Sequence, residues 1–426
     1  MARLFEHLSS AVRGLAISPA IAMAERCDRM RGAGEDVYKL ALGQSPFPVP
    51  DRIVEALRGH AGEKDYLPAD GLPLLRRAVA RFVERRIGID RGADDVLVGP
   101  GSKELLFLLQ IVFAGELVVP TPSWPAYLPQ ARVLGHEVTL VHARAENGFM
   151  VTATELDRAL SGRDGRPRLL ALNFPNNPTG LTYRTEELKD IAKVARAHDV
   201  LVLSDEIYGE LHHKGQHASI AKHYPEGTII SGGMSKWLGA GGWRLGTFVF
   251  PQELRALREA MAALESETFT STSAPISYAA AAAFDGGEDI ERYLANVRRV
   301  LAAVGRHTAR RITALGLGCA QPVGGFHVFV DFTPRADLLR ARGIGTSAQL
   351  VERLLDDTGV ALLPGSAFGR DESELTARLS YVDFDGTKAL AAVQAIPKEQ
   401  PLDETFLRRQ APRILAAIDA IGGWIG

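Results

Sequence analysis

The stretch Thr228-Ile-Ile-Ser-Gly-Gly-Met-Ser-Lys236-Trp-Leu-Gly-Ala-Gly-Gly-Trp-Arg244-Leu-Gly246 places Lys236 on a glycine-rich loop just beyond a predicted strand. Arg244 follows eight residues later. A lysine held on such a loop can form a Schiff base with an aldehyde, and a nearby arginine can hold an anion. Isolated lysines and arginines are more often solvated surface or loop residues. The rest of the chain therefore decides whether Lys236 and Arg244 form a binding site or are ordinary loop residues.

The composition is that of a globular protein: 46% of the 426 residues are hydrophobic and 23% are charged. A net charge of -2 gives no field that would attract nucleic acid or an anionic membrane, so neither is expected as a partner. Two distant cysteines, Cys27 and Cys319, argue against a disulfide scaffold and suit a reducing compartment. With no signal-peptide pattern and no apolar stretch long enough to span a membrane, a cytoplasmic protein is expected.

Apolar runs alternate with helical patterns through the first two thirds of the chain, which predicts an α/β fold. Continuous apolar runs between helices indicate buried, largely parallel strands with helices on both faces. Ligands of such sheets bind at the carboxyl ends of the strands. The predicted strands cover residues 95–98, 116–119, 137–141, 168–173, 200–204 and 228–231.

The pattern changes after about residue 290 and predicts a smaller α+β domain. A long helix over 288–315 precedes a strand over 326–331, whose alternation indicates one exposed face. Two further strands are predicted at 360–363 and 378–382, and the segment before Gly43 is expected to pack with this part. The expected division is an N-terminal arm and part of the small domain at 1–45, a large domain at 46–290, and a small domain at 291–426.

Lys236 and Arg244 match the aldehyde and the phosphate of pyridoxal phosphate (PLP), and two residues after another strand could match its ring. The strand ends in Ser204-Asp205-Glu-Ile-Tyr208. The Asp205 carboxylate could pair with a protonated pyridine nitrogen, and Tyr208 could donate to the phenolic oxygen. The alternative is that Asp205 only caps the helix that follows.

Two turn motifs add further candidates. Asn173-Phe-Pro-Asn-Asn177-Pro-Thr-Gly180 is too rich in turn residues for a strand or a helix. Asn177 could donate to the same phenolic oxygen, although an ordinary turn would also explain the motif. Gly101-Ser102-Lys103 opens a helix after a strand, where free backbone N–H groups suit a phosphate.

Three other side chains are candidate binding residues, and each also has a simpler structural explanation. Trp124 lies on a loop after a strand and could stack on a flat cofactor or be a core residue. Tyr66 lies on a polar loop and could be surface decoration. Arg378 lies in an apolar strand, where its planar fork suits a substrate carboxylate or a protein carboxylate.

No metal site is expected from the sequence. His212-His213 has no further ligand at metal spacing and is predicted to be a solvated loop pair. His327 alternates out of a strand and is expected to pack rather than to bind a metal.

Taken in order, these pieces resemble the class I/II aminotransferases, the aspartate-aminotransferase-like PLP enzymes of fold type I. The resemblance covers nearly the whole chain and implies a mixed, mostly parallel seven-stranded sheet between helices, plus a smaller α+β domain. It rests on Ser18-Pro19, Gly43, Tyr66, Gly101-Ser-Lys103, Trp124, Asn177-Pro-Thr-Gly180, Asp205-x-x-Tyr208, Ser235-Lys236, Gly-Trp-Arg244 and Arg378-Leu-Ser-Tyr381.

The resemblance also implies a role for each residue at the reacting end of the cofactor. Lys236 would be the Schiff-base lysine and would move the proton at the substrate Cα. Asp205 would meet the pyridine nitrogen, while Asn177 and Tyr208 would meet the phenolic oxygen. Arg378 would bind the substrate α-carboxylate, with backbone contact at Gly43 and with Asn177 nearby.

Further roles concern the phosphate, the ring face and the partner subunit. Arg244 and the backbone of Ser102 and Lys103 would hold the phosphate, and Trp124 would stack on the ring. Tyr66 would reach the phosphate of the neighbouring subunit, which implies an obligate homodimer with shared active sites.

Two features depart from the family pattern. Many relatives have a phosphate-binding serine three residues before the lysine, where this chain has Gly233; Ser231 or Ser235 could substitute. Dicarboxylate-specific members place a second arginine on the loop that corresponds roughly to Glu265–Ser273, and this stretch has no basic residue. A preference for aspartate or glutamate is therefore not supported.

The function predicted is a PLP-dependent aminotransferase that moves an amino group between an amino acid and a 2-oxo acid. The main alternative is another PLP reaction on the same fold, by a decarboxylase, a lyase or an oxidase, because pocket geometry rather than motifs selects the reaction. A PLP-sensing transcription regulator would need a DNA-binding domain before Gly43, and some forty residues without a basic recognition helix precede it.

Overall fold

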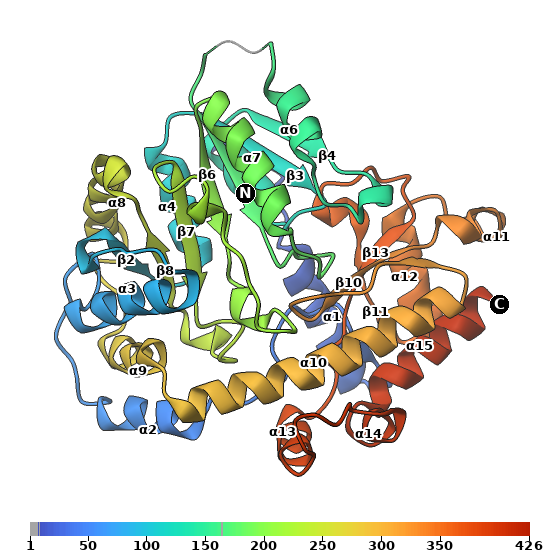
Figure 1. Ribbon diagram of the computed structural model, residues 1–426. Helices are drawn as coiled ribbons and strands as arrows, with labels where there is room; N and C mark the ends of the chain where they lie inside the picture. The colour runs from blue at the N-terminus through green and yellow to red at the C-terminus, as the bar shows by residue number, and fades with distance from the viewer. Residues whose placement is uncertain (1–6, 8, 163–164) are drawn as a thin grey trace.

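The computed structural model describes residue 7, residues 9–162 and residues 165–426 (Figure 1). The remaining residues of the expected N-terminal arm, 1–6 and 8, lie outside this part of the chain. The domain boundaries at residues 45 and 290 stay predictions. No helix within the described ranges is both long and apolar enough to cross a membrane.

The larger sheet has seven strands in the order β2-β8-β7-β6-β5-β3-β4, which confirms the predicted sheet. Strand β8 is antiparallel to both of its neighbours, and the other pairs are parallel. The sequence pattern does not predict β8, because its four residues follow the Arg244 loop directly. The strands are β2 (Val96–Gly99), β3 (Glu116–Thr121), β4 (Val138–His142), β5 (Arg168–Asn173), β6 (Val200–Asp205), β7 (Thr228–Gly233) and β8 (Gly246–Val249).

Helices cover both faces of this sheet (Figure 1). In β5, Leu169 and Ala171 face one layer while Leu170 and Leu172 face the other, which explains the continuous apolar run. The first layer contains α4 (Ser102–Val112), α5 (Tyr127–Leu134) and α8 (Arg255–Thr268). The second contains α2 (Asp51–Gly59), α3 (Pro73–Ile87), α6 (Ala153–Leu160), α7 (Thr185–Ala197) and α9 (Ala274–Asp285).

Helix α3 shows the local signals that begin and end such an element. Pro73 opens it, at a position where a backbone N–H would have no partner inside the helix. Gly88 follows its last residue with a φ of 73°, a left-handed conformation that glycine adopts without strain. Its buried face, which includes Leu75 and Val79, packs against α9.

The C-terminal third forms a four-stranded sheet in the order β12-β13-β10-β9. Strand β1 (Tyr38–Lys39) pairs in parallel with β11 (Val360–Ala361). The long α10 extends from the α2 and α9 side toward α15 (Figure 1). The strands are β9 (Gly318–Cys319), β10 (His327–Asp331), β12 (Leu363–Pro364) and β13 (Thr376–Ser380). The helices are α1 (Pro19–Gly32), α10 (Glu288–Ala314), α11 (Ala336–Ala341), α12 (Ser347–Thr358), α13 (Gly386–Gln394), α14 (Glu404–Gln410) and α15 (Pro412–Ile425).

Two sequence interpretations are wrong. Strand β10 is not half-exposed, because Val328 and Val330 join the core beneath α10 while Phe329 packs on the opposite face with Phe368. The prediction that His212 and His213 form a solvated pair is wrong as well. His212 is buried, and its Nδ1 accepts hydrogen bonds from the backbone N–H groups of residues 214 and 216.

The expected loop over 265–273 is also shorter than predicted, because α8 continues to Thr268. Glu265 therefore lies on a helix and is fully buried. Neither of its carboxyl oxygens has a hydrogen-bond partner among the described residues. Burial raises the pKa of Glu265 to about 9, and the nearby charge of Asp70 adds to the effect.

Glu265 predicts a pH dependence of stability. The folded protein holds its proton up to about pH 9, whereas the unfolded chain releases it above the ordinary value of 4.5. Rising pH therefore favours unfolding between these values. The free energy of unfolding of the wild-type protein is expected to fall by about 1.4 kcal/mol per pH unit relative to that of the Glu265→Gln protein. Urea titrations of both proteins from pH 5 to pH 9 measure the difference. Below about pH 4.5 both states are protonated, so the dependence disappears.

Glu267 provides a matched control because it is exposed on the same helix. The Glu267→Gln protein is expected to keep the wild-type slope. If wild type and Glu265→Gln gave parallel stability curves across this range, Glu265 would not be protonated in the folded protein.

Candidate functional site

A cavity of about 460 Å³ lies at the carboxyl ends of β5, β6 and β7 and at the N-terminus of α4. Parallel strands bring these ends to one edge of the sheet, where ligands of such sheets bind. Ten predicted residues line it: Gly43, Ser102, Lys103, Trp124, Asn177, Asp205, Tyr208, Ser235, Lys236 and Arg244. The structure thus brings together residues that are spread over two hundred positions of sequence.

Lys236 lies in a turn three residues after the end of β7. Its Nζ donates a 2.7 Å hydrogen bond to the carbonyl oxygen of Gly43 and lies 5.7 Å from the centre of the Tyr208 ring. Burial lowers the pKa of Lys236 to about 8, and the charge of Arg378 acts in the same direction. A substantial fraction of the amine is therefore neutral, and hence nucleophilic, near pH 8.

Asp205 is the last residue of β6, and its carboxylate is buried at the floor of the cavity. Oδ2 accepts a 2.7 Å hydrogen bond from Tyr127 Oη, while the contact of Oδ1 with the Ile207 N–H is long, at 3.4 Å. Burial raises the pKa of Asp205 to about 6. The carboxylate is thus mostly ionised at neutral pH, and its contact with Ile207 is too weak to make helix capping its main role.

Arg378 on β13 is buried behind Asn177 and has no carboxylate partner among the described residues. Its Nη1 donates to Asn177 Oδ1 at 2.9 Å, and its Nη2 donates to the Ala41 carbonyl. Burial lowers the pKa of Arg378 to about 10. The structure therefore excludes the alternative of a protein salt bridge and leaves a buried cation next to the cavity.

The opposite end of the cavity can hold an anion. The N-terminus of α4 at Ser102 and Lys103 has no side-chain cap, so its N–H groups can bind a ligand. The Arg244 guanidinium lies against Gly101, where any side chain would collide with it. Arg244 itself has a φ of 55°, a left-handed conformation that is uncommon outside glycine and often found at functional sites. Ser235 also lines the cavity.

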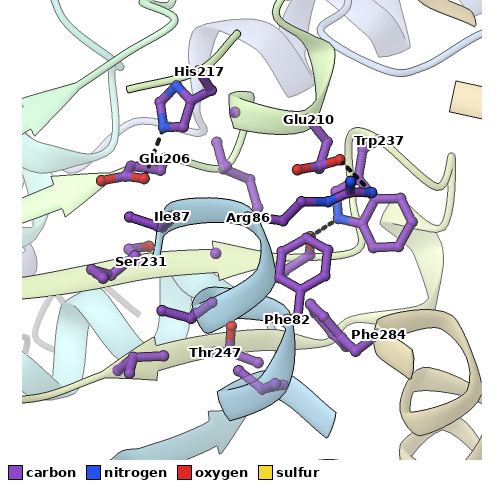
Figure 2. Close-up of a pocket in the computed structure, with 18 of the residues that line it drawn as sticks. Phe82, Arg86, Ile87, Glu206, Glu210, His217, Ser231, Trp237, Thr247 and Phe284 are labelled. Carbon is purple, nitrogen blue, oxygen red and sulfur yellow. Dashed lines mark hydrogen bonds and ion pairs between the residues drawn. The ribbon is translucent and has the colours of Figure 1, made fainter. Parts of the chain in front are cut away.

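Gly233 faces away from this cavity and lines a second one of about 110 Å³, shown in Figure 2. A side chain at position 233 would approach the Leu245 carbonyl oxygen to 2.8 Å, and the φ of 152° also favours glycine. Ser231 lines the second cavity too, so of the two serines considered only Ser235 lies in the first.

The second cavity does not fit PLP, although it is closed on several sides. Figure 2 shows three of its polar groups paired: the Glu206 carboxylate with His217, the Glu210 carboxylate with Arg86, and Trp237 with a backbone oxygen. Arg86 Nε and His217 Nδ1 have no hydrogen-bond partner among the described residues. It contains no lysine. The cavity around Lys236 is therefore the candidate active site.

Trp124 and Tyr66 differ in their placement. Trp124 is half-buried at the cavity wall and packs edge-to-face on Tyr127, with ring centres 5.5 Å apart. Tyr66 is 87% exposed on the loop between α2 and α3 and does not line the cavity of its own chain. The backbone N–H of Leu67, next to it, is held by Ser271 Oγ at 3.3 Å.

Sequence reasoning missed several residues of the site. Tyr127 is part of the Pro-Ser-Trp-Pro-Ala-Tyr motif, but only its tryptophan stood out. His327 contacts Tyr208 Oη through Nε2 at 3.0 Å, and nothing in its strand pattern marks this contact. Ile21 and Gln44 complete the lining from the N-terminal segment.

The donor set of the first cavity fits PLP. Lys236 supplies an amine for the aldehyde, and Asp205 supplies an acceptor for a pyridine N–H. Arg244 and the N-terminus of α4 supply the phosphate end. Arg378 Nε is buried without a hydrogen-bond partner in the described chain, as expected for a group that completes its contacts with an anionic substrate.

Comparisons with known proteins agree with this geometry. The family model described as aminotransferase class I and II matches residues 35–396. The aspartate aminotransferase of Geobacillus stearothermophilus is 32% identical, over 88% of this chain and 94% of that protein. The asparagine–oxo-acid transaminase of Streptococcus mutans is 30% identical, with the same coverage of both chains.

Solved structures give the same result. The aspartate aminotransferase of Thermus thermophilus, solved with maleate, has a TM-score of 0.81 and 31% identity, over 91% of this chain and 98% of that chain. The aspartate aminotransferase of Rhizobium meliloti has a TM-score of 0.80 and 27% identity, over 97% and 99%. With a family match over most of its length, this chain belongs to the class I and II aminotransferases and is a PLP-dependent aminotransferase.

Proposed function

We propose that Lys236, Arg378 and Asp205 carry out transamination between an amino acid and a 2-oxo acid in this cavity. The main support is that Lys236 and Arg378, two cations without a carboxylate partner in the described chain, converge next to the Asp205 carboxylate. Burying two such cations destabilises the folded protein unless an anionic ligand pairs with them.

Lys236 acts as the covalent anchor and then as the proton carrier. When bound, PLP supplies an aldehyde for the amino group and a ring that accepts the electrons of the broken Cα–H bond. Lys236 Nζ would hold the cofactor through its aldehyde. Burial and the charge of Arg378 lower the pKa of Lys236 to about 8, so its amine can serve as a base for the proton at the substrate Cα and then return it as an acid.

Arg378 orients the substrate through its α-carboxylate. Its guanidinium donates to Asn177 Oδ1 and to the Ala41 carbonyl, and its Nε has no partner among the described residues, so a planar fork is held next to the cavity for a carboxylate. Gly43 lies against Arg378 and adds backbone contact without a side chain in the way. A carboxylate bound here brings Cα close to Lys236, whose Nζ is hydrogen-bonded to Gly43.

The remaining residues hold the cofactor ring and its phosphate. Asp205, itself held by Tyr127, accepts the pyridine N–H. The Asn177 side chain binds Arg378 through Oδ1, which leaves Nδ2 to donate to the phenolic oxygen together with Tyr208. Trp124 would cover the ring face. Arg244, Ser235 and the backbone N–H groups of Ser102 and Lys103 would hold the phosphate.

The proposed substrates are amino acids and 2-oxo acids that bind through the α-carboxylate. The names of the relatives include aspartate, asparagine and prephenate, and the Thermus structure was solved with maleate. In this chain residues 265–273 contain no basic side chain, and Glu265 is buried in α8. This segment is therefore not proposed to select a substrate with a side-chain carboxylate.

The enzyme is proposed to be a cytoplasmic homodimer with Tyr66 contributed across the interface. Tyr66 is 87% exposed, and the N-terminal segment exposes Leu15, Ile17 and Ile21, which a second subunit could cover. Both cysteines are free, which agrees with a reducing compartment.

A half-reaction screen tests the proposed reaction. PLP-loaded protein is incubated with one amino acid at a time, and 2-oxo acid, ammonia, carbon dioxide and oxygen uptake are measured. Transamination predicts 2-oxo acid in an amount equal to the cofactor, and continued turnover only when a second 2-oxo acid is added. Release of ammonia or carbon dioxide, or uptake of oxygen, would replace the proposal with a lyase, a decarboxylase or an oxidase.

Lys236→Ala is expected to remove the absorbance band of the linked cofactor and to lower kcat by at least about 10⁴-fold, because both the anchor and the proton carrier are lost. Absorbance spectra and steady-state kinetics measure these effects. Lys214→Ala, on an exposed loop, is the control and is expected to match wild type. Retention of the band in Lys236→Ala would assign the covalent link to another lysine.

Arg378→Met is expected to raise the KM for the amino acid and for the 2-oxo acid by about 10- to 100-fold, because charge-assisted hydrogen bonds to the carboxylate are lost. PLP affinity is expected to change much less. Since Arg378 has no carboxylate partner among the described residues, Arg378→Met is also expected to destabilise the protein less than Arg76→Met. Arg76 is paired with Asp70 and Asp94. Equal destabilisation, with an unchanged KM, would make Arg378 a structural residue.

Mixed dimers test the position of Tyr66. When Tyr66→Ala and Lys236→Ala chains are co-refolded, each heterodimer has one site with Lys236 from one chain and Tyr66 from the other. Random assortment predicts that about a quarter of all sites are intact, so the mixture exceeds either parent in activity. An activity no higher than the average of the two parents would show that Tyr66 does not act across the interface.

A further inference from the structure

His327 is a buried histidine whose two ring nitrogens both have polar partners at the edge of the active site. It is the first residue of β10 and is paired with Ser380 on β13. Nδ1 lies 2.8 Å from Ser380 Oγ, and Nε2 lies 3.0 Å from Tyr208 Oη. The three groups thus form a continuous hydrogen-bonded chain from the four-stranded sheet to the cofactor cavity.

The imidazole of His327 is neutral in the folded protein. It is fully buried, and two cations face it: Arg378 from β13 and Lys236 from the loop after β7. Burial lowers the pKa of His327 well below its ordinary value, and both charges act in the same direction. A neutral imidazole has one N–H, so it donates at one end of this chain and accepts at the other.

Ser380 decides which nitrogen carries the hydrogen. Its side chain is fully buried, and His327 Nδ1 is the one acceptor found for its hydroxyl in the described chain. If Nδ1 carried the hydrogen, the Ser380 O–H would be a buried donor without a partner among the described residues. Tyr208 differs because it lines the cavity, where a bound ligand can accept its O–H. The favoured arrangement is therefore Ser380 O–H donating to Nδ1 and Nε2–H donating to Tyr208 Oη.

We propose that His327 is a positioning residue for Tyr208: its Nε2–H occupies the tyrosine oxygen and directs the tyrosine O–H into the cofactor cavity. This inference rests on the proposed function, in which Tyr208 donates to the phenolic oxygen of PLP. A hydroxyl that accepts one hydrogen bond is polarised and becomes a stronger donor in the next. Without His327 the O–H would be free to rotate away from the cofactor.

The effect is measurable in the pH titration of cofactor absorbance in the holoenzyme. Once linked to PLP, the Lys236 nitrogen titrates near an anionic phenolic oxygen, which favours the protonated nitrogen. A hydrogen bond from Tyr208 stabilises that oxygen and so lowers the midpoint pH at which the linked Lys236 nitrogen loses its proton in the absorbance titration. His327→Phe keeps a buried ring but removes the donor, so the midpoint is expected to rise by roughly 0.5 unit or more. His327→Gln can place an amide N–H near Nε2 and is expected to restore much of the shift.

A double-mutant cycle separates a positioning role from a general packing effect. If His327 acts through Tyr208, His327→Phe shifts the midpoint in wild type but not in a Tyr208→Phe background. The same shift in both backgrounds would overturn the proposal. Ser380→Ala removes the donor that selects the Nε2–H form and is expected to shift the midpoint in the same direction by a smaller amount. If His327→Phe fails to fold, an unchanged midpoint in Ser380→Ala overturns the proposal.

The control is His307→Phe, which replaces another buried imidazole on α10 that contacts Arg310. Its midpoint is expected to equal that of wild type. Failure of this inference is distinguishable from failure of the proposed function. An absorbance band that depends on Lys236 but does not respond to His327 rejects only the role of His327. Loss of any dependence on Lys236 rejects the proposed function itself.

Discussion

The active site depends on a buried cation that the protein does not neutralise. Arg378 is surrounded by β13, Asn177 and the Ala41 carbonyl, and no carboxylate of the described chain reaches it. Burying such a charge is unfavourable unless a ligand supplies the opposite charge. In the proposed function the substrate carboxylate supplies that opposite charge, so the buried, unpaired Arg378 would provide the electrostatic binding energy that orients the substrate.

The two sheets contribute different parts of the chemistry. Asn177, Asp205 and Lys236 lie at or just beyond the ends of β5, β6 and β7, and are proposed to bind the cofactor. Strands β10 and β13 supply His327 and Arg378, which address Tyr208 and the substrate. The distance between Lys236 and Arg378 is therefore set by how the two sheets pack, and Gly43 lies between them, in contact with Lys236, His327 and Arg378.

Much of the fold and of the site was predictable because parallel strands leave a clear pattern. A continuous apolar run followed by a polar cluster gives both the strand and its functional end, as in residues 200–205 and 168–173. Strand β8 and the burial of β10 were not predictable, because the first follows the Arg244 loop directly and the second depends on cover from distant elements. Tyr127 and His327 were missed because a tyrosine or a histidine in an apolar segment is usually a packed residue, and their partners lie 78 and 119 positions away.

Gly233 shows how a departure from the family pattern follows from packing. The strand end at 233 lies so close to the Leu245 carbonyl that no side chain fits, and its face is turned to the second cavity rather than to the cofactor. Ser235, two residues later in the turn, lines the cofactor cavity, as Arg244 does. In the proposed arrangement Ser235 takes the phosphate contact in the turn that carries Lys236, so one short segment would hold both the phosphate and the aldehyde of the cofactor.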